Sequence, residues 1–277
     1  VDISEVELFE KLATITLRLR DGHSSLLDSE NNLFAGYNFV AGYFPNFNLD
    51  ILRDNYFGKD TPSLVVRLNE DLSAIRIAYG TLPQAPEIGY ILIPSWTTDI
   101  RDKEIESIFA AVKDTKGLIF DQRQNTGGNP ALATRFAAYF TDEPVYTGFE
   151  RFKVGPGAND FVDSPVILQP AASENRYTKP VAVLIDRFVY SAGTTFSYSV
   201  DPIPTVTFYG QRSGGGSGSV ADGYLANGWK WELSISEFID AQGRHLDDGV
   251  DPDVLVKLDL EDKTQDEVIE RALEDLQ

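Results

Sequence analysis

Residues 180–196 limit most strongly what this chain can fold into. The apolar run at residues 181–186 predicts a buried β-strand, and residues 192–200 have the pattern of a helix. A turn of small residues that carries Ser191 joins the two. Such units belong to folds in which helices cover a mostly parallel sheet. The unit also places a serine beside the free N–H groups of a helix start, where negative charge is stabilised.

Strands and helices alternate from about residue 74 almost to the end of the chain, which predicts an α/β fold. The expected strands are residues 74–79, 88–94, 117–122, 181–186 and 205–209. The expected helices are residues 103–113, 130–139 and 192–200. We therefore divide the chain into residues 1–75, a small N-terminal cap segment, and residues 76–277, the core domain.

Capping-box patterns mark a helix near each end of the chain. Ser4 and Glu7 begin an amphipathic pattern over residues 4–20, and Thr264 and Glu267 begin one that runs to the C-terminus. Residues 33–69 have an irregular pattern that is ambiguous between short strands and loops, and we draw no fold from them. The glycine-rich residues 213–219 have linker composition, but strand-like sequence flanks them on both sides, so we expect a loop folded over the core.

Composition excludes several classes of function. The formal net charge of −19 argues against binding to nucleic acid or to anionic membrane surfaces. The absence of cysteine excludes disulfides, thiolate zinc sites and cysteine nucleophiles, and no apolar run approaches the ~20 residues that span a bilayer. The chain begins at Val1 without any methionine, so we expect that a leader was removed or that methionines are missing from the sequence.

Two further features could carry chemistry. The strand at residues 117–122 ends in a polar turn with Gly127 and Gly128, and Asn129-Pro130 then starts a helix. Paired glycines let backbone N–H groups point outward, which suits an oxyanion site. The chain has only two histidines, His23 and His245, and neither has metal-ligand spacing. We expect no metal and no cofactor.

Six short motifs follow one another in a characteristic order. They are Asp-Gly-His-Ser at 21–24, Gly-Tyr-Ile-Leu-Ile at 89–93, Asp-x-Arg-x-Asn-x-Gly-Gly at 121–128, Ser-Ala-Gly at 191–193, a glycine loop after Gly210, and Gly-Val-Asp-Pro-Asp at 249–253. Together they resemble the tail-specific, or C-terminal-processing, serine peptidase family. The chain is most similar to the tricorn-core subgroup, without the PDZ module of many members.

The resemblance implies a crotonase-like β/α core with Ser191 as the nucleophile. The N–H of Ala192 and that of Gly127 or Gly128 would form the oxyanion hole. Asp121 and Arg123 would brace the glycine turn.

The general base differs between subgroups of this family. In the Ser–Lys subgroup a lysine lies in the glycine loop, but residues 214–217 here contain none, and the nearby Lys230 would need a strongly lowered pKa. The tricorn-like subgroup uses a histidine, which His23 matches. The resemblance places Asp247 or Asp248 as the carboxylate that orients it, although the family has a glutamate about one position upstream. His245 is a rival base.

The resemblance implies a serine endopeptidase that acts on proteins or peptides and is secreted, periplasmic or attached to the bacterial cell surface. A catalytically inactive member that binds peptides or apolar ligands is the alternative, motivated by the lysine-free loop and the uncertain third residue. The oligomeric state and the preferred cleavage site are left open.

Overall fold

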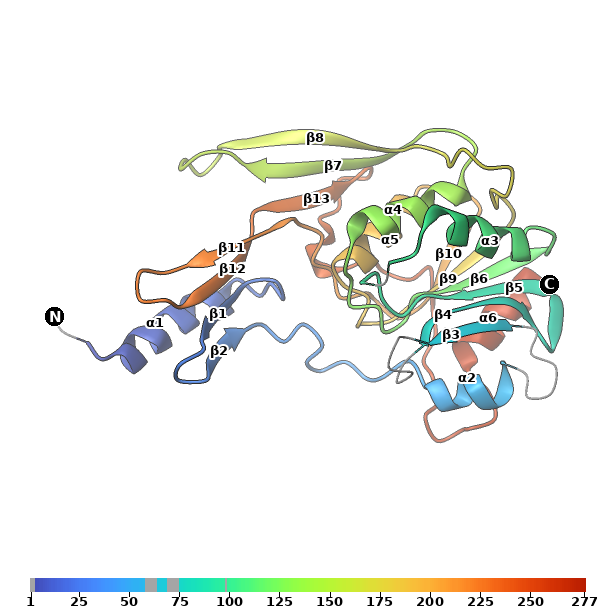
Figure 1. Cartoon of the computed structure of the whole chain (residues 1–277), viewed down its shortest axis with the longest axis horizontal. Helices are drawn as coiled ribbons and strands as arrows, with labels where there is room; N and C mark the ends of the chain where they lie inside the picture. Colours follow the sequence, from blue (N-terminus) through green and yellow to red (C-terminus); the bar gives the residue numbers. More distant parts are fainter. Residues whose placement is uncertain (1–2, 58–63, 69–74, 98) are drawn as a thin grey trace.

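The computed structural model describes residues 3–57, 64–68, 75–97 and 99–277. At its centre is a seven-stranded sheet in the order β14-β10-β9-β6-β5-β4-β3 (Figure 1). From β5 to β14 neighbouring strands are parallel, whereas β3 and β4 pair antiparallel at one edge. The strands are β3 (Leu64–Leu68), β4 (Ile75–Leu82), β5 (Ala85–Leu92), β6 (Gly117–Asp121), β9 (Val181–Ile185), β10 (Val206–Gly210) and β14 (Val254–Leu255).

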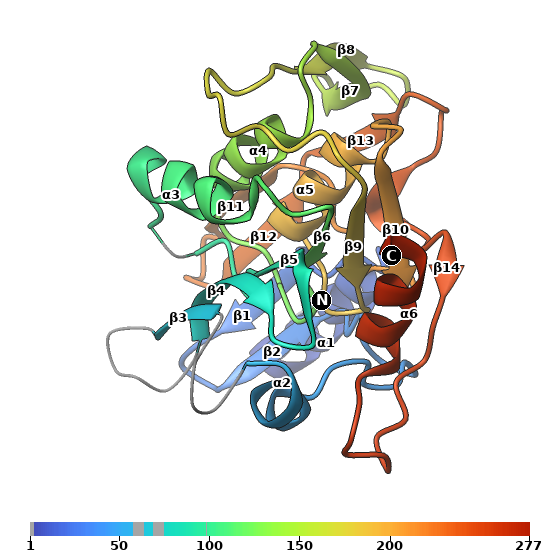
Figure 2. The ribbon, with the colours of Figure 1, turned by 90° about the vertical axis from the view of Figure 1, so that its right-hand side faces the viewer.

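Helices cover both faces of this sheet (Figure 2). One face carries α3 (Asp102–Val112), α4 (Pro130–Ala137) with the short 3-10 helix η1 (Ala138–Phe140), and α5 (Ala192–Val200). The other face carries α2 (Leu49–Asn55) and α6 (Glu267–Leu276). Every residue of β6 and β9 is buried, which is why both strands are continuous apolar runs rather than alternating patterns. The expected α/β architecture is confirmed.

A second, smaller unit, here named the N-terminal lobe, combines the first residues of the chain with a later segment, residues 220–234. It consists of α1 (Glu5–Arg18), β1 (Ser25–Asp28), β2 (Leu33–Gly36), β11 (Val220–Tyr224) and β12 (Lys230–Ser234), with the sheet order β11-β12-β1-β2. Phe9 of α1 packs edge-on against Trp229, with ring centroids 5.3 Å apart. Residues 220–234 therefore complete a sheet that begins almost 200 residues earlier.

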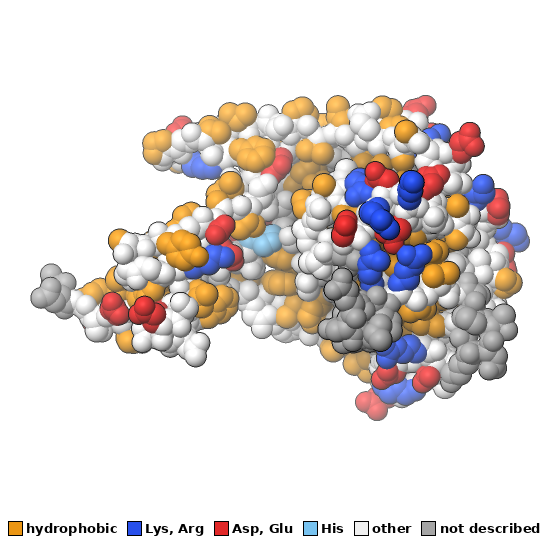
Figure 3. All heavy atoms as spheres, in the orientation of Figure 1, with side chains coloured by type: hydrophobic (Ala, Val, Ile, Leu, Met, Phe, Trp, Pro, Cys, Tyr) orange, Lys and Arg blue, Asp and Glu red, His pale blue; other side chains and the backbone are white. Residues whose placement is uncertain are grey.

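A third sheet, in the order β13-β7-β8, extends beside the N-terminal lobe (Figure 1). It contains β7 (Val145–Lys153), β8 (Phe161–Leu168) and β13 (Ser236–Asp240). The space-filling view shows a hollow between this sheet, the N-terminal lobe and the core, with hydrophobic side chains along its borders (Figure 3). None of the described helices is long and apolar enough to cross a membrane.

Most expected helices and strands of the core are present, with ends that differ by a few residues. The strand expected at 74–79 begins at Ala74, which lies outside the described residues, and β4 begins at Ile75. The glycine-rich segment is a loop whose residues 213–216 are buried, as expected.

One expectation was wrong, and another was incomplete. The N-cap of α6 is Asp266 rather than Thr264, because the Asp266 carboxylate accepts the N–H groups of Val268 and Ile269. Residues 33–69, which could be short strands or loops by their sequence, contain the strands β2 and β3 and also the helix α2, which was not expected. The two strands are only four and five residues long, and each pairs with a nearby segment, β2 with β1 and β3 with β4. Their shortness explains why the local pattern did not reveal them.

Candidate active site

Ser191 lies at the start of α5, in the turn that follows β9. It is the N-cap of the helix, with φ 54° and ψ −119°, a conformation that residues with a side chain rarely adopt. Its N–H donates to the carbonyl of Gly215 at 2.9 Å, and its own carbonyl accepts the N–H of Thr195 at 3.0 Å. These contacts hold Ser191 in a strained geometry of the kind found at functional sites.

The glycine turn after β6 lies directly beside Ser191. Because β6 and β9 are parallel neighbours, their carboxyl ends meet at one edge of the sheet. The N–H of Tyr190 donates to the carbonyl of Asn125 at 3.0 Å. Gly127 has φ +108°, and a Cβ there would lie 2.7 Å from the Ser191 Cβ and 3.0 Å from the Ala192 nitrogen. Only glycine fits at this contact.

The N–H groups of the two glycines differ in their surroundings. The N–H of Gly127 donates to Asn125 Oδ1 at 3.0 Å. The backbone N–H of Trp96 donates to the carbonyl of Gly127, and the backbone carbonyl of Trp96 accepts the N–H of Asn129. These two hydrogen bonds form a parallel bridge between Trp96 and Gly128. In that pattern Gly128 directs its own N–H away from Trp96. Among the described residues this N–H has no acceptor.

His23 lies against the residue that precedes Ser191. Its ring centroid is 4.9 Å from that of Tyr190, and its Nδ1 is buried without a hydrogen-bond partner in the part of the chain that the structure describes. Burial lowers the pKa of His23, against the opposing effect of the carboxylates of Asp21 and Asp247. The imidazole is therefore neutral at neutral pH and able to accept a proton.

Asp21 belongs to the Asp-Gly-His-Ser motif, but no role was predicted for it. It connects the His23 turn to its surroundings. Its carboxylate accepts the backbone N–H of His23 at 3.0 Å. It also accepts the hydroxyls of Ser24, Ser234 and Tyr190 at 2.6, 2.8 and 3.2 Å. Burial acts to raise the pKa of Asp21, but these hydrogen bonds outweigh it and the pKa lies below its usual value. The available signal was its place two residues before a histidine, where aspartate commonly accepts a turn N–H.

Asp247 lies in the 3-10 helix η2 (Leu246–Asp248), next to the glycine loop. Its Oδ1 accepts the N–H of Ser217 at 3.0 Å and the Ser217 hydroxyl at 2.7 Å. Asp247 is exposed as a residue, but partial desolvation of its carboxyl raises the pKa of Asp247, while these two hydrogen bonds act to lower it. The carboxyl of Asp248 is exposed, and its backbone carbonyl accepts from Arg187.

Close packing explains why the glycine loop carries no lysine. A side chain at Gly215 would overlap the carbonyl of Asp247, and one at Gly216 would overlap the ring of Tyr190. Gly215 and Gly216 also have φ values of +88° and +65°. Both the space and the backbone conformation therefore demand glycine.

Lys230 and His245 have other partners. Lys230 Nζ donates to Glu232 at 2.8 Å, and this hydrogen bond raises the pKa of Lys230, opposite to what a lysine base requires. His245 is exposed, with its Nδ1 2.8 Å from Glu237 Oε2.

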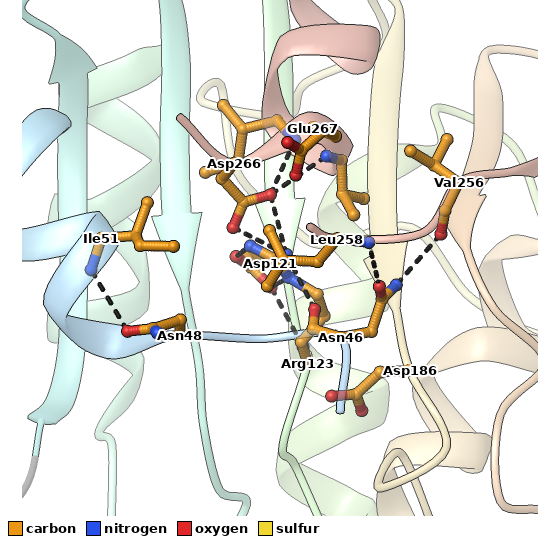
Figure 4. A network of polar contacts seen from close by, with 12 residues as sticks. Asn46, Asn48, Ile51, Asp121, Arg123, Asp186, Val256, Leu258, Asp266 and Glu267 are labelled. Carbon is orange, nitrogen blue, oxygen red and sulfur yellow. Dashed lines mark hydrogen bonds and ion pairs between the residues drawn. The ribbon is translucent and has the colours of Figure 1, made fainter. Parts of the chain in front are cut away.

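A fully buried ion-pair network, here named the Arg123 cluster, fixes the start of the glycine turn (Figure 4). Arg123 donates to Asp121 Oδ2 at 2.7 Å, to Asp266 Oδ2 at 2.9 Å and to the carbonyl of Asn46 at 3.1 Å. The Tyr90 hydroxyl donates to Asp121 at 2.9 Å. The contacts join β6 to α6 and to the segment before α2, which is a structural role.

A small pocket of about 140 Å³ opens beside Ser191. It is lined by Pro130, Glu150, Ser191, Ala192, Thr195, Tyr198 and residues 216–219. It therefore lies where β7, α5 and the glycine loop meet.

Comparisons with known proteins identify the family. The sequence profile of peptidase family S41 matches residues 87–256. A crystal structure of a candidate peptidase from Parabacteroides merdae is 34% identical, with a TM-score of 0.85, and the match covers 99% of this chain and 84% of that one. No protein in the curated comparison set matches.

Two more distant structures share the fold. Mature CPAF is 15% identical with a TM-score of 0.58, and the match covers 77% of this chain and 53% of that one. The tricorn protease is 22% identical with a TM-score of 0.50, and the match covers 69% of this chain and 18% of that one. With the profile match over most of the core, these findings show that the chain belongs to peptidase family S41 and is a serine peptidase.

Proposed function

We propose that the chain is an endopeptidase with a crotonase-like core that cleaves proteins or peptides, with Ser191 as nucleophile and His23 as general base. The observation that carries the proposal is the meeting of three distant segments around one serine. Gly127 touches Ser191 closely enough to exclude a side chain, and His23 packs against Tyr190. A peptide that lies over Ser191 would be within reach of all three segments.

In this mechanism His23 takes the proton of the Ser191 hydroxyl as Oγ attacks the peptide carbonyl. The proton then passes to the departing amine when the C–N bond breaks, and water releases the acyl group by the same steps. The lowered pKa of His23 suits this role, because a neutral imidazole is the form that accepts a proton.

The oxyanion hole in our proposal uses the N–H groups of Ala192 and Gly128. Ala192 is the first residue of α5, where backbone N–H groups have no partner within the helix. Gly127 is the weaker candidate for the second donor, since its N–H already donates to Asn125. Each donor of this kind contributes about 2.7–4 kcal/mol to transition-state stabilisation in acyl transfer.

Asp247 is the third member of the proposed site. Its carboxylate raises the pKa of His23, and the same charge would stabilise the imidazolium that forms during the reaction. Its hydrogen bonds to Ser217 give it a fixed position in the glycine loop.

Covalent labelling tests the assignment of the nucleophile. We expect a fluorophosphonate probe to label the wild-type protein and to leave Ser191→Ala unlabelled. A mass-spectrometric digest of denatured casein should show cleavage by the wild type and none by Ser191→Ala or His23→Ala. Equal labelling of wild type and Ser191→Ala would show that another residue is the nucleophile. A labelled protein that cuts nothing would favour a binding function.

A further inference from the structure

The pocket beside Ser191 contains one charged side chain, that of Glu150 on β7. None of the residues that line the pocket is a lysine or an arginine. The glycine loop, the start of α5 and Pro130 form the rest of its walls. A substrate side chain that enters this pocket would therefore meet a carboxylate in the pocket that Ser191 also lines.

The two oxygens of the Glu150 carboxylate are used unequally. Oε1 accepts the hydroxyls of Ser219 at 2.7 Å and Ser236 at 2.5 Å, whereas Oε2 has no partner among the described residues. The neighbouring Arg151 does not neutralise this charge, because it pairs with Asp163 and Glu237 instead. Glu150 is thus held in place by hydroxyls while half of its accepting capacity is unused.

The other walls suit the stem of a long side chain. The ring of Tyr198 is fixed by stacking on Phe238, with centroids 3.6 Å apart and planes 7° apart. A volume of about 140 Å³ is close to that of a cavity that holds one benzene molecule, roughly 150 Å³, so it accepts a single side chain. Lysine and arginine combine an apolar stem with a cationic head, which matches a ring beside a carboxylate.

We propose that Glu150 makes this pocket a subsite for a lysine or arginine side chain adjacent to the scissile bond. The inference rests on the proposed function, because it takes Ser191 as the nucleophile. The excess of acidic residues, 43 against 24 basic ones, acts in the same direction by attracting basic peptides at low ionic strength.

The test compares matched peptides on the whole chain. Cleavage sites are first mapped in denatured casein, and peptides are then made with lysine, norleucine or glutamate at each position flanking the cut. We expect kcat/KM for lysine to exceed that for norleucine by about tenfold or more. Glu150→Gln should abolish this preference, because glutamine still accepts the Ser219 and Ser236 hydroxyls but carries no charge. Glu150→Lys should favour glutamate.

Two controls separate this inference from the assignment of Ser191 as nucleophile. The first control is Asp163→Asn. Asp163 carries a carboxylate on the same sheet but lies outside the pocket, so this variant should keep the lysine preference. The second control is the rate at which a small fluorophosphonate labels Ser191, which reports whether each variant is folded. Labelled, active enzyme with no lysine preference, or with one that survives Glu150→Gln, would overturn the subsite alone. If Ser191 is neither labelled nor required for cleavage, the proposed nucleophile is wrong and the subsite fails with it.

Discussion

The Arg123 cluster and the Ser191 site both start at the ends of neighbouring strands, yet they differ in how completely their polar groups are paired. In the Arg123 cluster the guanidinium has two carboxylates and a carbonyl as partners. At the Ser191 site, His23 Nδ1 is buried and unpaired among the described residues. The Gly128 N–H and Glu150 Oε2 also lack protein partners there, but Gly128 is exposed and Glu150 is half-buried, so these two groups are open to solvent or to a substrate.

This difference separates stabilising from reactive polar groups. Buried polar groups in proteins are almost always hydrogen-bonded, and an unpaired one costs stability unless a ligand or a reaction uses it. In the Arg123 cluster the buried polar groups find their hydrogen-bond partners within the fold. At the Ser191 site we propose that a bound substrate and the reaction use the unpaired groups, so substitutions in the two regions should affect different measurements.

The largest expected effect is on catalysis. His23→Ala should lower kcat/KM for peptide cleavage by about 10⁴- to 10⁶-fold, while the free energy of unfolding changes by no more than about 1 kcal/mol. Chemical denaturation and steady-state kinetics measure the two quantities. His245→Ala is the matched control, since the other histidine is exposed, and it should retain full activity. Equal losses in both variants would contradict the role of His23.

Removing Arg123 should instead affect stability most. Arg123→Met leaves the carboxylates of Asp121 and Asp266 buried without their cation, and we expect a loss of about 3–5 kcal/mol in the free energy of unfolding. Urea denaturation measures it. Arg151→Met removes a surface ion pair and should change little. A stable Arg123→Met protein would show that the cluster does not brace the fold.

A substitution at Gly127 should affect both quantities moderately. Gly127→Ala strains the backbone at φ +108° and presses a methyl group against Ser191, so we expect about 1–3 kcal/mol of destabilisation and about a hundredfold lower kcat/KM. Gly228→Ala is the control for backbone strain alone, because Gly228 has φ +88° but no atom lies within 4 Å of its Cβ position. It should keep its activity. A Gly127→Ala enzyme as active as Gly228→Ala would refute the close contact.

The smallest effect is a shift in pH dependence. kcat/KM should fall as the pH drops through the pKa of His23, which burial holds below its ordinary value of 6.5. Asp247 favours the protonated imidazole, so Asp247→Asn should lower that pKa and move the acid limb of the pH–rate profile to lower pH. Asp163→Asn should leave the limb in place. A shift toward higher pH in Asp247→Asn would contradict the charge effect assigned to Asp247.

Much of the core could be predicted from local patterns. The apolar runs of β6 and β9 and the helix after Ser191 are encoded by neighbouring residues. The N-terminal lobe could not be predicted, because β1 pairs with β12 across about 200 residues and neither strand is longer than five residues. The cap of α6 was assigned to Thr264 because the sequence does not reveal that Asp266 is buried against Arg123.

The sequence by itself determined that Ser191 follows a buried strand and starts a helix, and that a glycine turn ends another strand, because apolar runs and turn residues act locally. Only the tertiary structure decided which polar groups are already paired. Asp21 meets Tyr190 and Ser234 across 169 and 213 residues, and Glu150 meets Ser236 across 86. Such contacts depend on how the sheets and the lobe pack, which no local pattern contains.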